Sequence, residues 1–126
     1  MYEITLKGGF SSCHNLYDTQ GIFEPLHGHN FKVEVDLRRQ ELDSIGVVAD
    51  FVEIKRELNT VLQKIDMTYL NQLPELSGKN TSVENVARWI HDELKPRVRG
   101  KGVQIKRVTV WETEDAGASY VPDTAS

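Results

Sequence analysis

The stretch His27-Gly28-His29-Asn30-Phe31-Lys32-Val33-Glu34-Val35-Asp36-Leu37 decides the fold of this chain. Every second residue, from His27 to Leu37, is histidine or apolar, and the residues between them are glycine, asparagine or charged. Alternate side chains of an extended chain share a face, so the pattern predicts a strand with one buried face. His27 and His29 begin that face and point the same way. Gly28 lets other backbone or a ligand approach closely.

A first strand is predicted at the amino terminus. Residues 2–6 alternate between apolar and polar side chains, which is typical of a half-buried strand. Gly8-Gly9 predicts a bulge or a bend. If the alternation survives these glycines, His14 lies on the buried side and Cys13 on the other. Residues 15–26 are expected to form the connecting loop.

Two amphipathic helices are predicted in the middle of the chain. The first covers residues 51–65, where apolar side chains recur at helical spacing after an N-cap at Asp50. The second begins after a cap at Thr81 or Ser82 and is expected to end at Pro96.

The carboxyl-terminal part predicts a last strand over residues 103–113. The order strand, strand, helix, helix, strand indicates an α+β domain, an antiparallel sheet with two helices on one face. Residues 38–50 could add a hairpin partner. We expect a single domain over 1–126, with a loose tail over about 119–126.

Composition excludes several classes of function. The chain has 126 residues and a formal net charge of −4, which gives no general attraction to nucleic acid or to an anionic membrane. Its single cysteine excludes an intramolecular disulfide and a cysteine-rich zinc finger. With no apolar span long enough to cross a bilayer and no signal-peptide pattern, we expect a cytoplasmic protein.

Three histidines could form a metal site. His14 follows the first strand, and His27 and His29 begin the next, so they are neighbours if the strands pair antiparallel. A single histidine on a strand is more often a core or surface group. Three neutral imidazoles with an open fourth position, however, are the ligand pattern of a catalytic zinc site. Imidazole suits zinc best without excluding iron, nickel or copper.

Two carboxylates could add chemistry to this site. Glu24 precedes His27 by three positions, and is either a solvated loop residue or a general base beside a metal-bound substrate. Glu112 continues the apolar face of Val108 and Val110, where an unpaired charge is costly. It either pairs with an arginine of the protein or accepts two parallel hydrogen bonds from a guanidine-like edge, as in a pterin or purine.

A set of motifs runs in order through nearly the whole chain: Phe10-x-x-x-His14, His27-Gly28-His29, Asp50-Phe51-x-x-Ile54-Lys55, Ile65-Asp66-x-x-Tyr69-Leu70-Asn71, Asn80-Thr81-Ser82-x-Glu84, Trp89-Ile90 and Glu112-Thr113. Together they resemble the 6-pyruvoyl-tetrahydropterin synthase family, which includes the 6-carboxy-tetrahydropterin synthases of queuosine biosynthesis. The resemblance implies the tunnelling fold, in which the sheets of several subunits join into a barrel. The assembly is usually a homohexamer with active sites between subunits.

The resemblance also implies ligands for the site. It implies Zn2+ on the three histidines and 7,8-dihydroneopterin triphosphate as the small-molecule substrate. The pterin ring is then held by Glu112, with Thr81 and Ser82 nearby.

The sequence departs from the synthases of that family in two places. Phe23 stands four positions before the His-Gly-His motif, where those enzymes carry cysteine, and Met67 follows Asp66 in place of a histidine. Glu24 instead matches the Glu-x-x-His-Gly-His pattern of a variant group. Members of that group cleave the substrate side chain and release 6-hydroxymethyl-7,8-dihydropterin, a folate precursor.

The leading hypothesis is therefore a zinc-dependent carbon–carbon lyase, in which Glu24 moves a proton and Asp66 assists or orients. The alternatives within the family are the 6-carboxy- and 6-pyruvoyl-tetrahydropterin reactions, against which the missing cysteine argues. A third is a catalytically inactive paralogue that binds a pterin or a metal without turnover. If the histidines are incidental, the chain is an α+β domain of another function.

Overall fold

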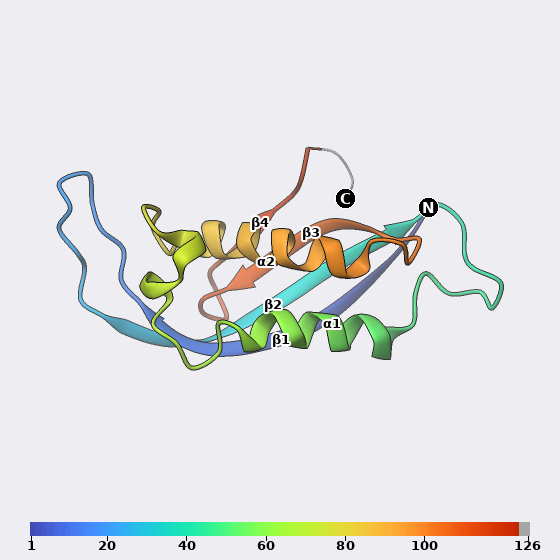
Figure 1. Cartoon of the computed structure of the whole chain (residues 1–126), viewed down its shortest axis with the longest axis horizontal. Coiled ribbons are helices and arrows are strands. Elements are labelled where there is room, and N and C mark those ends of the chain that lie inside the picture. The colour runs from blue at the N-terminus through green and yellow to red at the C-terminus, as the bar shows by residue number, and fades with distance from the viewer. Residues whose placement is uncertain (124–126) are drawn as a thin grey trace.

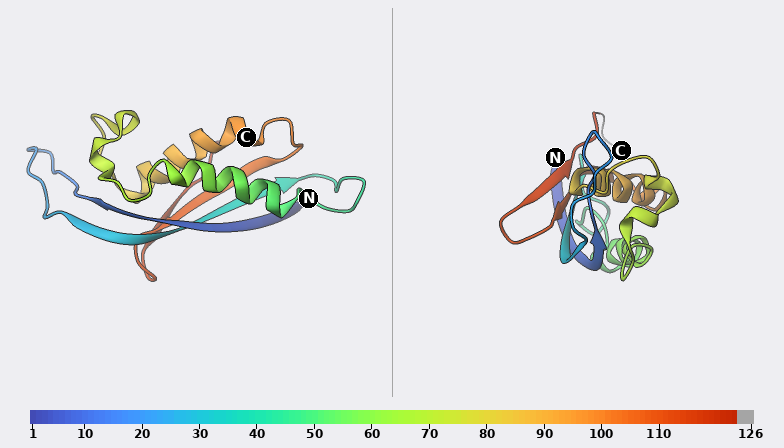
Figure 2. Two further views of the ribbon diagram at one scale, coloured as in Figure 1. Left: turned by 60° about the horizontal axis from the view of Figure 1, so that its bottom comes forward. Right: turned by 90° about the vertical axis from the view of Figure 1, so that its left-hand side faces the viewer.

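Four strands and two α-helices form the architecture of residues 1–123, the part of the chain that the computed structural model describes. In chain order the elements are β1 (Tyr2–His14), β2 (His27–Arg39), α1 (Phe51–Gln63), the 3-10 turns η1 (Leu70–Gln72) and η2 (Pro74–Leu76), α2 (Val83–Val98), β3 (Gln104–Trp111) and β4 (Gly117–Tyr120). The strands form one antiparallel sheet in the order β1-β2-β3-β4. Both helices cover the same face of it (Figure 1; Figure 2). The predicted α+β architecture is confirmed.

β1 and β2 form a long hairpin whose register is unbroken over the 13 residues of each strand. The bulge predicted at Gly8-Gly9 is therefore wrong, because the pairing passes through both glycines without a shift. A Cβ on Gly8 would lie 2.8 Å from Cδ1 of Leu62, so glycine here lets α1 pack directly on the strand. The preserved alternation places His14 on the buried side, with only 2 % of its surface exposed.

The segment between β2 and α1 is a loop, and the hairpin partner considered over residues 38–50 does not form. The carboxylate of Asp43 organises this loop by accepting hydrogen bonds from the backbone N–H groups of Ile45 and Val47. α1 then starts as predicted, since the Asp50 side chain accepts from the N–H of Val52 at 2.9 Å.

Ser82 rather than Thr81 is the N-cap of α2, because its hydroxyl accepts from the backbone N–H of Asn85. The helix continues through Pro96 to Val98, so the predicted end at the proline is wrong. A proline in the last turn removes one intrahelical hydrogen bond. The burial of the Val98 side chain, which is 1 % exposed, compensates for this loss.

The chain turns after β3 and returns as β4, an edge strand that the sequence pattern did not predict. β3 ends two residues before the predicted boundary, at Trp111, because the N–H of Glu112 bonds the carbonyl of Ala116 and starts the turn. The last two residues of β4 belong to the predicted loose tail over 119–126 and are paired with β3. Residues 124–126 of that tail lie outside the described part of the chain.

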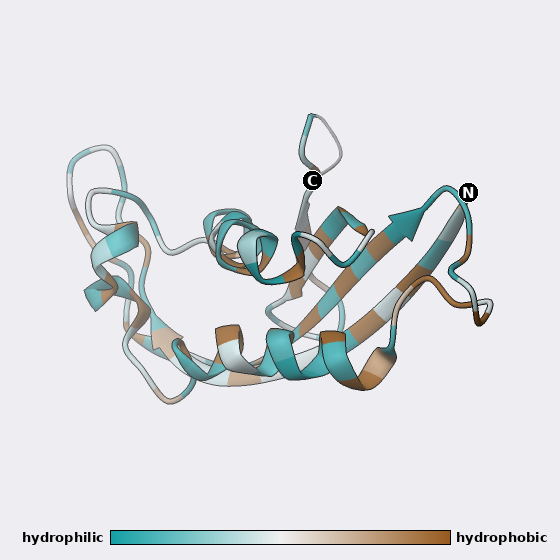
Figure 3. Cartoon of the chain, turned by 45° about the vertical axis from the view of Figure 1, so that its right-hand side comes forward, coloured by the Kyte–Doolittle hydropathy of each residue, from teal (hydrophilic) through white to brown (hydrophobic). Residues whose placement is uncertain are grey.

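The core lies between the two helices and one face of the sheet, and its apolar residues alternate with polar ones along the strands (Figure 3). The hairpin end that carries the loop over residues 15–26 extends beyond the helices (Figure 1). That end holds the three histidines. Within residues 1–123, no helix combines the length and apolar character needed to cross a membrane.

Candidate metal centre

β1 and β2 bring the three predicted histidines together at one end of the sheet. His14 is the last residue of β1 and lies directly opposite His27, the first residue of β2. His29 follows on the same face. The ring centroids of His14 and His27 are 4.6 Å apart, and those of His27 and His29 are 4.8 Å apart.

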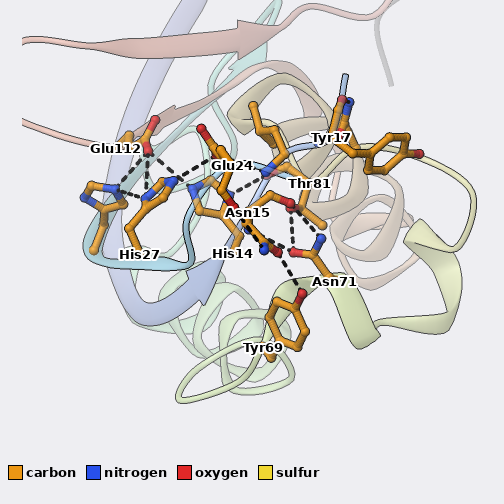
Figure 4. Close-up of polar contacts among 12 residues, drawn as sticks. His14, Asn15, Tyr17, Glu24, His27, Tyr69, Asn71, Thr81 and Glu112 are labelled. Carbon is orange, nitrogen blue, oxygen red and sulfur yellow. Dashed lines mark hydrogen bonds and ion pairs between the residues drawn. The ribbon is translucent and has the colours of Figure 1, made fainter. Parts of the chain in front are cut away.

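Glu112, from the turn after β3, completes the cluster (Figure 4). Its Oε1 lies 2.9 Å from Nε2 of His29, 3.3 Å from Nε2 of His14 and 3.8 Å from Nδ1 of His27. One ligand atom from each of the four residues lies within 4.8 Å of the others. The charge of Glu112 thus faces the histidines rather than an arginine of the protein.

Hydrogen bonds on the outer side of two histidines orient their rings. Nδ1 of His14 lies 2.7 Å from the carbonyl oxygen of Thr81, which can only accept, so Nδ1 carries the proton and Nε2 turns its lone pair inward. Nε2 of His27 lies 2.9 Å from Oε1 of Glu24. An ionised carboxylate oxygen can only accept, so Nε2 carries the proton and Nδ1 of His27 turns its lone pair inward. Outer partners of this kind are typical of metal-ligating histidines.

The donor atoms fit a divalent metal ion of the zinc type. Nδ1 of His27 and Nε2 of His29 lie 2.7 Å apart, so without an ion one of the two nitrogens must donate a hydrogen bond to the other, and with an ion both can turn their lone pairs toward it. Three imidazole nitrogens with one carboxylate oxygen are ligands that zinc accepts. The predicted zinc site is thus chemically consistent with the arrangement of the side chains.

Glu24 lies at the outer side of the cluster and is held as an anion. Its side chain is 40 % exposed, and its Oε1 also accepts from the backbone N–H of Leu16 at 2.9 Å. The hydrogen bond from His27, followed by that from Leu16, lowers the pKa of the Glu24 carboxyl below its ordinary value. The residue is therefore ionised at neutral pH and can accept a proton.

The other three predicted site residues lie further from the centre. Thr81 is 1 % exposed and lies behind His14. The hydroxyl of Ser82 caps α2. The carboxylate of Asp66 accepts from the backbone N–H of Ser11 at 2.8 Å, at the outer edge of β1. The structure thus gathers five of the eight predicted residues around one point, and sets Thr81 directly behind them.

A pocket of about 570 Å³ opens on the other side of the hairpin and reaches the cluster at His29. Cys13 and Met67 also line it. The thiol of Cys13 is directed away from the histidines, toward the carbonyl of Thr68 at 3.7 Å. Met67 has a positive φ of 55° and is 81 % exposed.

Two amide side chains that the sequence analysis did not single out hold the backbone of the loop after β1, and one of them, Asn71, lies next to Thr81 (Figure 4). Asn71 bonds both backbone groups of Asn15, and Asn80 bonds both backbone groups of Tyr17. Asn71 and Asn80 stand within the motifs quoted above, which is a usable signal. The backbone groups that these amides bond cannot be identified from the sequence, because every non-proline residue has an N–H and a C=O group.

Comparison with known proteins gives consistent matches. Residues 3–123 match the protein family described as "6-pyruvoyl tetrahydropterin synthase". A "Putative 6-carboxy-5,6,7,8-tetrahydropterin synthase" of Archaeoglobus fulgidus is 36% identical over 115 residues, 91% of each chain. A "Dihydroneopterin monophosphate aldolase" of Pyrococcus furiosus is 29% identical over 115 residues, covering 91% of this chain and 93% of the other.

Among solved structures, the 6-pyruvoyl tetrahydropterin synthase of Caenorhabditis elegans superposes with a TM-score of 0.80 over 98% of each chain. Its sequence identity is 23%, so this likeness establishes the fold alone.

Proposed function

The chain belongs to the 6-pyruvoyl tetrahydropterin synthase family and has its tunnelling fold, and from this premise we propose that it is a zinc-dependent pterin lyase. The proposed reaction cleaves the side chain of 7,8-dihydroneopterin triphosphate and releases 6-hydroxymethyl-7,8-dihydropterin. The name of the Pyrococcus relative, a monophosphate aldolase, supports cleavage and makes the monophosphate the second substrate to test.

One observation carries the choice of cleavage over the synthase reactions: a carboxylate, not a thiol, lies beside the histidine cluster. Oε1 of Glu24 is 2.9 Å from Nε2 of His27. The thiol of the single cysteine, Cys13, contacts the carbonyl of Thr68, which lies along the outer edge of β1. Proton transfer in the synthases is expected to use a cysteine and a histidine, at places where this chain has Phe23 and Met67.

In the proposed mechanism His14, His27 and His29 would hold the zinc ion, which when bound would act as a Lewis acid and lower the pKa of a substrate hydroxyl. Glu24 accepts the proton of the hydroxyl on the second side-chain carbon. The bond between the first and second side-chain carbons then breaks. Its electron pair forms a double bond between the first carbon and C6, the π pair of C6=N5 moves onto N5, and C6=N5 is restored when the first carbon is protonated. The second carbon leaves as an aldehyde that keeps the phosphate, and Glu24 returns the proton to the first carbon.

Four further residues have supporting parts in this proposal. Glu112 accepts two hydrogen bonds from the guanidine-like edge of the pterin, and Ser82, the N-cap of α2, is proposed to lie near the ring. Thr81 acts from behind His14, to which its carbonyl is bonded. Asp66 orients the segment after α1 by bonding the backbone of Ser11.

A synthase is the second candidate, favoured by the 36% identity to the Archaeoglobus relative named a putative 6-carboxy-5,6,7,8-tetrahydropterin synthase. In that case a group other than Cys13 must transfer the protons. An inactive pterin- or metal-binding paralogue is the third candidate. We also propose a cytoplasmic homohexamer with active sites between subunits, which native mass spectrometry tests directly.

Product identification separates these candidates. Zinc-loaded protein is incubated with dihydroneopterin triphosphate or monophosphate, and the pterins are identified by liquid chromatography and mass spectrometry. We expect 6-hydroxymethyl-7,8-dihydropterin, with turnover reduced by about 10²–10⁴-fold in Glu24→Gln. The matched control, Glu41→Gln, changes an exposed glutamate of the loop after β2 and should retain full activity. A 6-carboxy or 6-pyruvoyl product contradicts the proposal, and binding without turnover selects the inactive paralogue.

A further inference from the structure

A chain of hydrogen bonds leads from the imidazole of His14 to a side chain that does not touch the cluster. Nδ1 of His14 donates to the carbonyl of Thr81 at 2.7 Å, and the Thr81 hydroxyl donates to Oδ1 of Asn71 at 3.0 Å (Figure 4). We propose that Asn71 is a positioning residue of the metal centre, acting on His14 through Thr81. This inference rests on the metal site of the proposed function.

Asn71 also holds the backbone immediately after His14. Its Nδ2 donates to the carbonyl of Asn15 at 2.7 Å, and its Oδ1 accepts from the N–H of Asn15 at 3.2 Å. One carboxamide therefore fixes both ends of the histidine. It restrains the main chain that carries His14, and it restrains the residue whose carbonyl receives the ring proton.

The burial of this chain makes its geometry restrictive. His14 is 2 % exposed and Thr81 is 1 % exposed, so water cannot easily replace the bond between them. A ring held with Nδ1–H toward the Thr81 carbonyl presents Nε2 toward His29 and Glu112 in one orientation only. If the Thr81 carbonyl shifts, the ring loses this restraint. Loss of such an outer partner typically lowers metal affinity by about 10–100-fold.

The chemistry of the carboxamide is specific at this position. Asn71 must donate to one backbone group of Asn15 while it accepts from the other, and a carboxylate of the same shape can only accept. Asn71→Asp therefore sets a negative charge against the Asn15 carbonyl without a change in volume. Likewise, Thr81→Val removes the hydroxyl that donates a hydrogen bond to Asn71, and Thr81→Ser keeps this hydroxyl.

The chain offers a matched control in Asn80. Nδ2 of Asn80 donates to the carbonyl of Tyr17 at 2.9 Å, and its Oδ1 accepts from the N–H of Tyr17 at 2.8 Å. The same two-point contact is made here with a loop residue further from the histidines. Asn80→Asp therefore introduces the same chemical change, while the Thr81 hydroxyl keeps its bond to Asn71.

The experiment measures metal affinity and metal-free stability in parallel. Wild-type protein, Asn71→Asp, Thr81→Val, Thr81→Ser and Asn80→Asp are each titrated with Co2+ and with Zn2+ against a competing chelator. The visible spectrum of bound Co2+ reports ligand geometry, and thermal unfolding of the metal-free proteins reports structural damage. We expect wild-type protein to bind one ion per chain, and Asn71→Asp and Thr81→Val to bind about 10–100-fold more weakly with an altered Co2+ spectrum. Thr81→Ser and Asn80→Asp should stay within about threefold of wild type, far below the effect of a lost outer partner.

The outcomes distinguish the inference from the function on which it rests. If wild-type protein binds no ion, the metal centre fails and the inference fails with it. If wild-type protein binds the ion and Asn71→Asp loses no more affinity than Asn80→Asp, the inference alone is overturned. The same holds if the losses in metal affinity merely follow the losses in metal-free stability across the variants.

Discussion

Oε1 of Glu112 lies 2.9 Å from Nε2 of His29, although one residue follows β3 and the other belongs to the start of β2. The same oxygen is within 3.8 Å of the other two histidines. All three contacts are made by Oε1, so a pterin that bonds both carboxylate oxygens must share Oε1 with the histidines. The proposed pterin contact therefore competes with the contacts to the histidines.

Replacement of Glu112 tests the proposed pterin contact. In Glu112→Gln the charged acceptor becomes a neutral amide, and we expect the affinity for neopterin to fall by about 1.5–3 kcal/mol. Isothermal titration of the zinc-loaded protein measures the change. Glu114→Gln, an exposed glutamate of the same turn, is the control and should bind neopterin as wild type does. Equal affinities of the two variants would exclude Glu112 as the pterin anchor.

Two glycines of the β1–β2 hairpin should respond differently to alanine. A Cβ on Gly9 would lie 2.9 Å from the backbone oxygen of Phe31, whereas a Cβ on Gly28 meets nothing closer than the backbone oxygen of Ser12 at 3.6 Å. Gly9→Ala must push the strands apart and should lower the free energy of unfolding by about 1–3 kcal/mol. Gly28→Ala should change it by about 0.5 kcal/mol or less. Urea unfolding of both metal-free variants measures these free energies. A similar loss of stability in Gly9→Ala and Gly28→Ala would contradict the prediction.

Replacement of Met67 by glycine should stabilise the protein. Its φ of 55° lies in the left-handed region, which costs an L-residue about 1–2 kcal/mol, and its exposed side chain gives up little packing. Glycine loses more conformational entropy on folding, which offsets part of the relieved strain. On balance, Met67→Gly should raise the free energy of unfolding by about 0.5–1 kcal/mol. Met67→Ala keeps its Cβ and should show no such gain in the same urea titration. If alanine and glycine stabilise equally, the positive φ is not the source of strain.

Asp43 should stabilise the loop after β2 in a pH-dependent way. Hydrogen bonds from the backbone N–H groups of Val47 and Ile45 lower the pKa of its carboxyl. A lowered folded-state pKa stabilises the protein above the ordinary carboxyl pKa of about 3.9, and the effect is lost as the pH falls through the lowered value. Asp43→Ala should therefore have a lower Tm than wild type at pH 7, and the gap should close in strong acid.

Metal-free protein is used for this comparison, so that loss of a bound ion in acid does not contribute to the difference in Tm. Glu41→Ala removes a nearby exposed carboxyl and should keep the wild-type Tm at both pH values. A gap for Asp43→Ala that does not change with pH would contradict the assignment.

The strands and the histidine cluster were predictable because alternation along β2 is a local signal that extends over the 13 residues of the strand. With the register of the hairpin, the same alternation puts His14 opposite His27. β4 escaped prediction because its alternation extends over only 4 residues, which is too short to distinguish a strand from a loop. The helix beyond Pro96 also escaped, because the compensating burial of Val98 belongs to tertiary packing.

The outer hydrogen bonds of the site were not predictable from the sequence. The acceptor of the His14 ring proton is a backbone carbonyl, that of Thr81, and every residue type has such a group. Glu24 was identified by its spacing from His27, but its orienting bond to that ring depends on how the loop over residues 15–26 folds. Asp66 is the opposite case. The sequence motif predicted it as a site residue, but in the structure its carboxylate accepts a hydrogen bond from the backbone of Ser11 at the edge of β1.

All three histidines lie in the β1–β2 hairpin, whereas Thr81 and Glu112 come from later elements. During synthesis on the ribosome, the nitrogen donors are therefore complete at residue 29, before either helix exists. A chain that met the ion at that stage would offer the three histidines without Glu112 or the Thr81 carbonyl, whereas the finished chain offers them with both in place. For the proposed zinc site, the stage at which the ion arrives is therefore a variable separate from the affinity of the finished site.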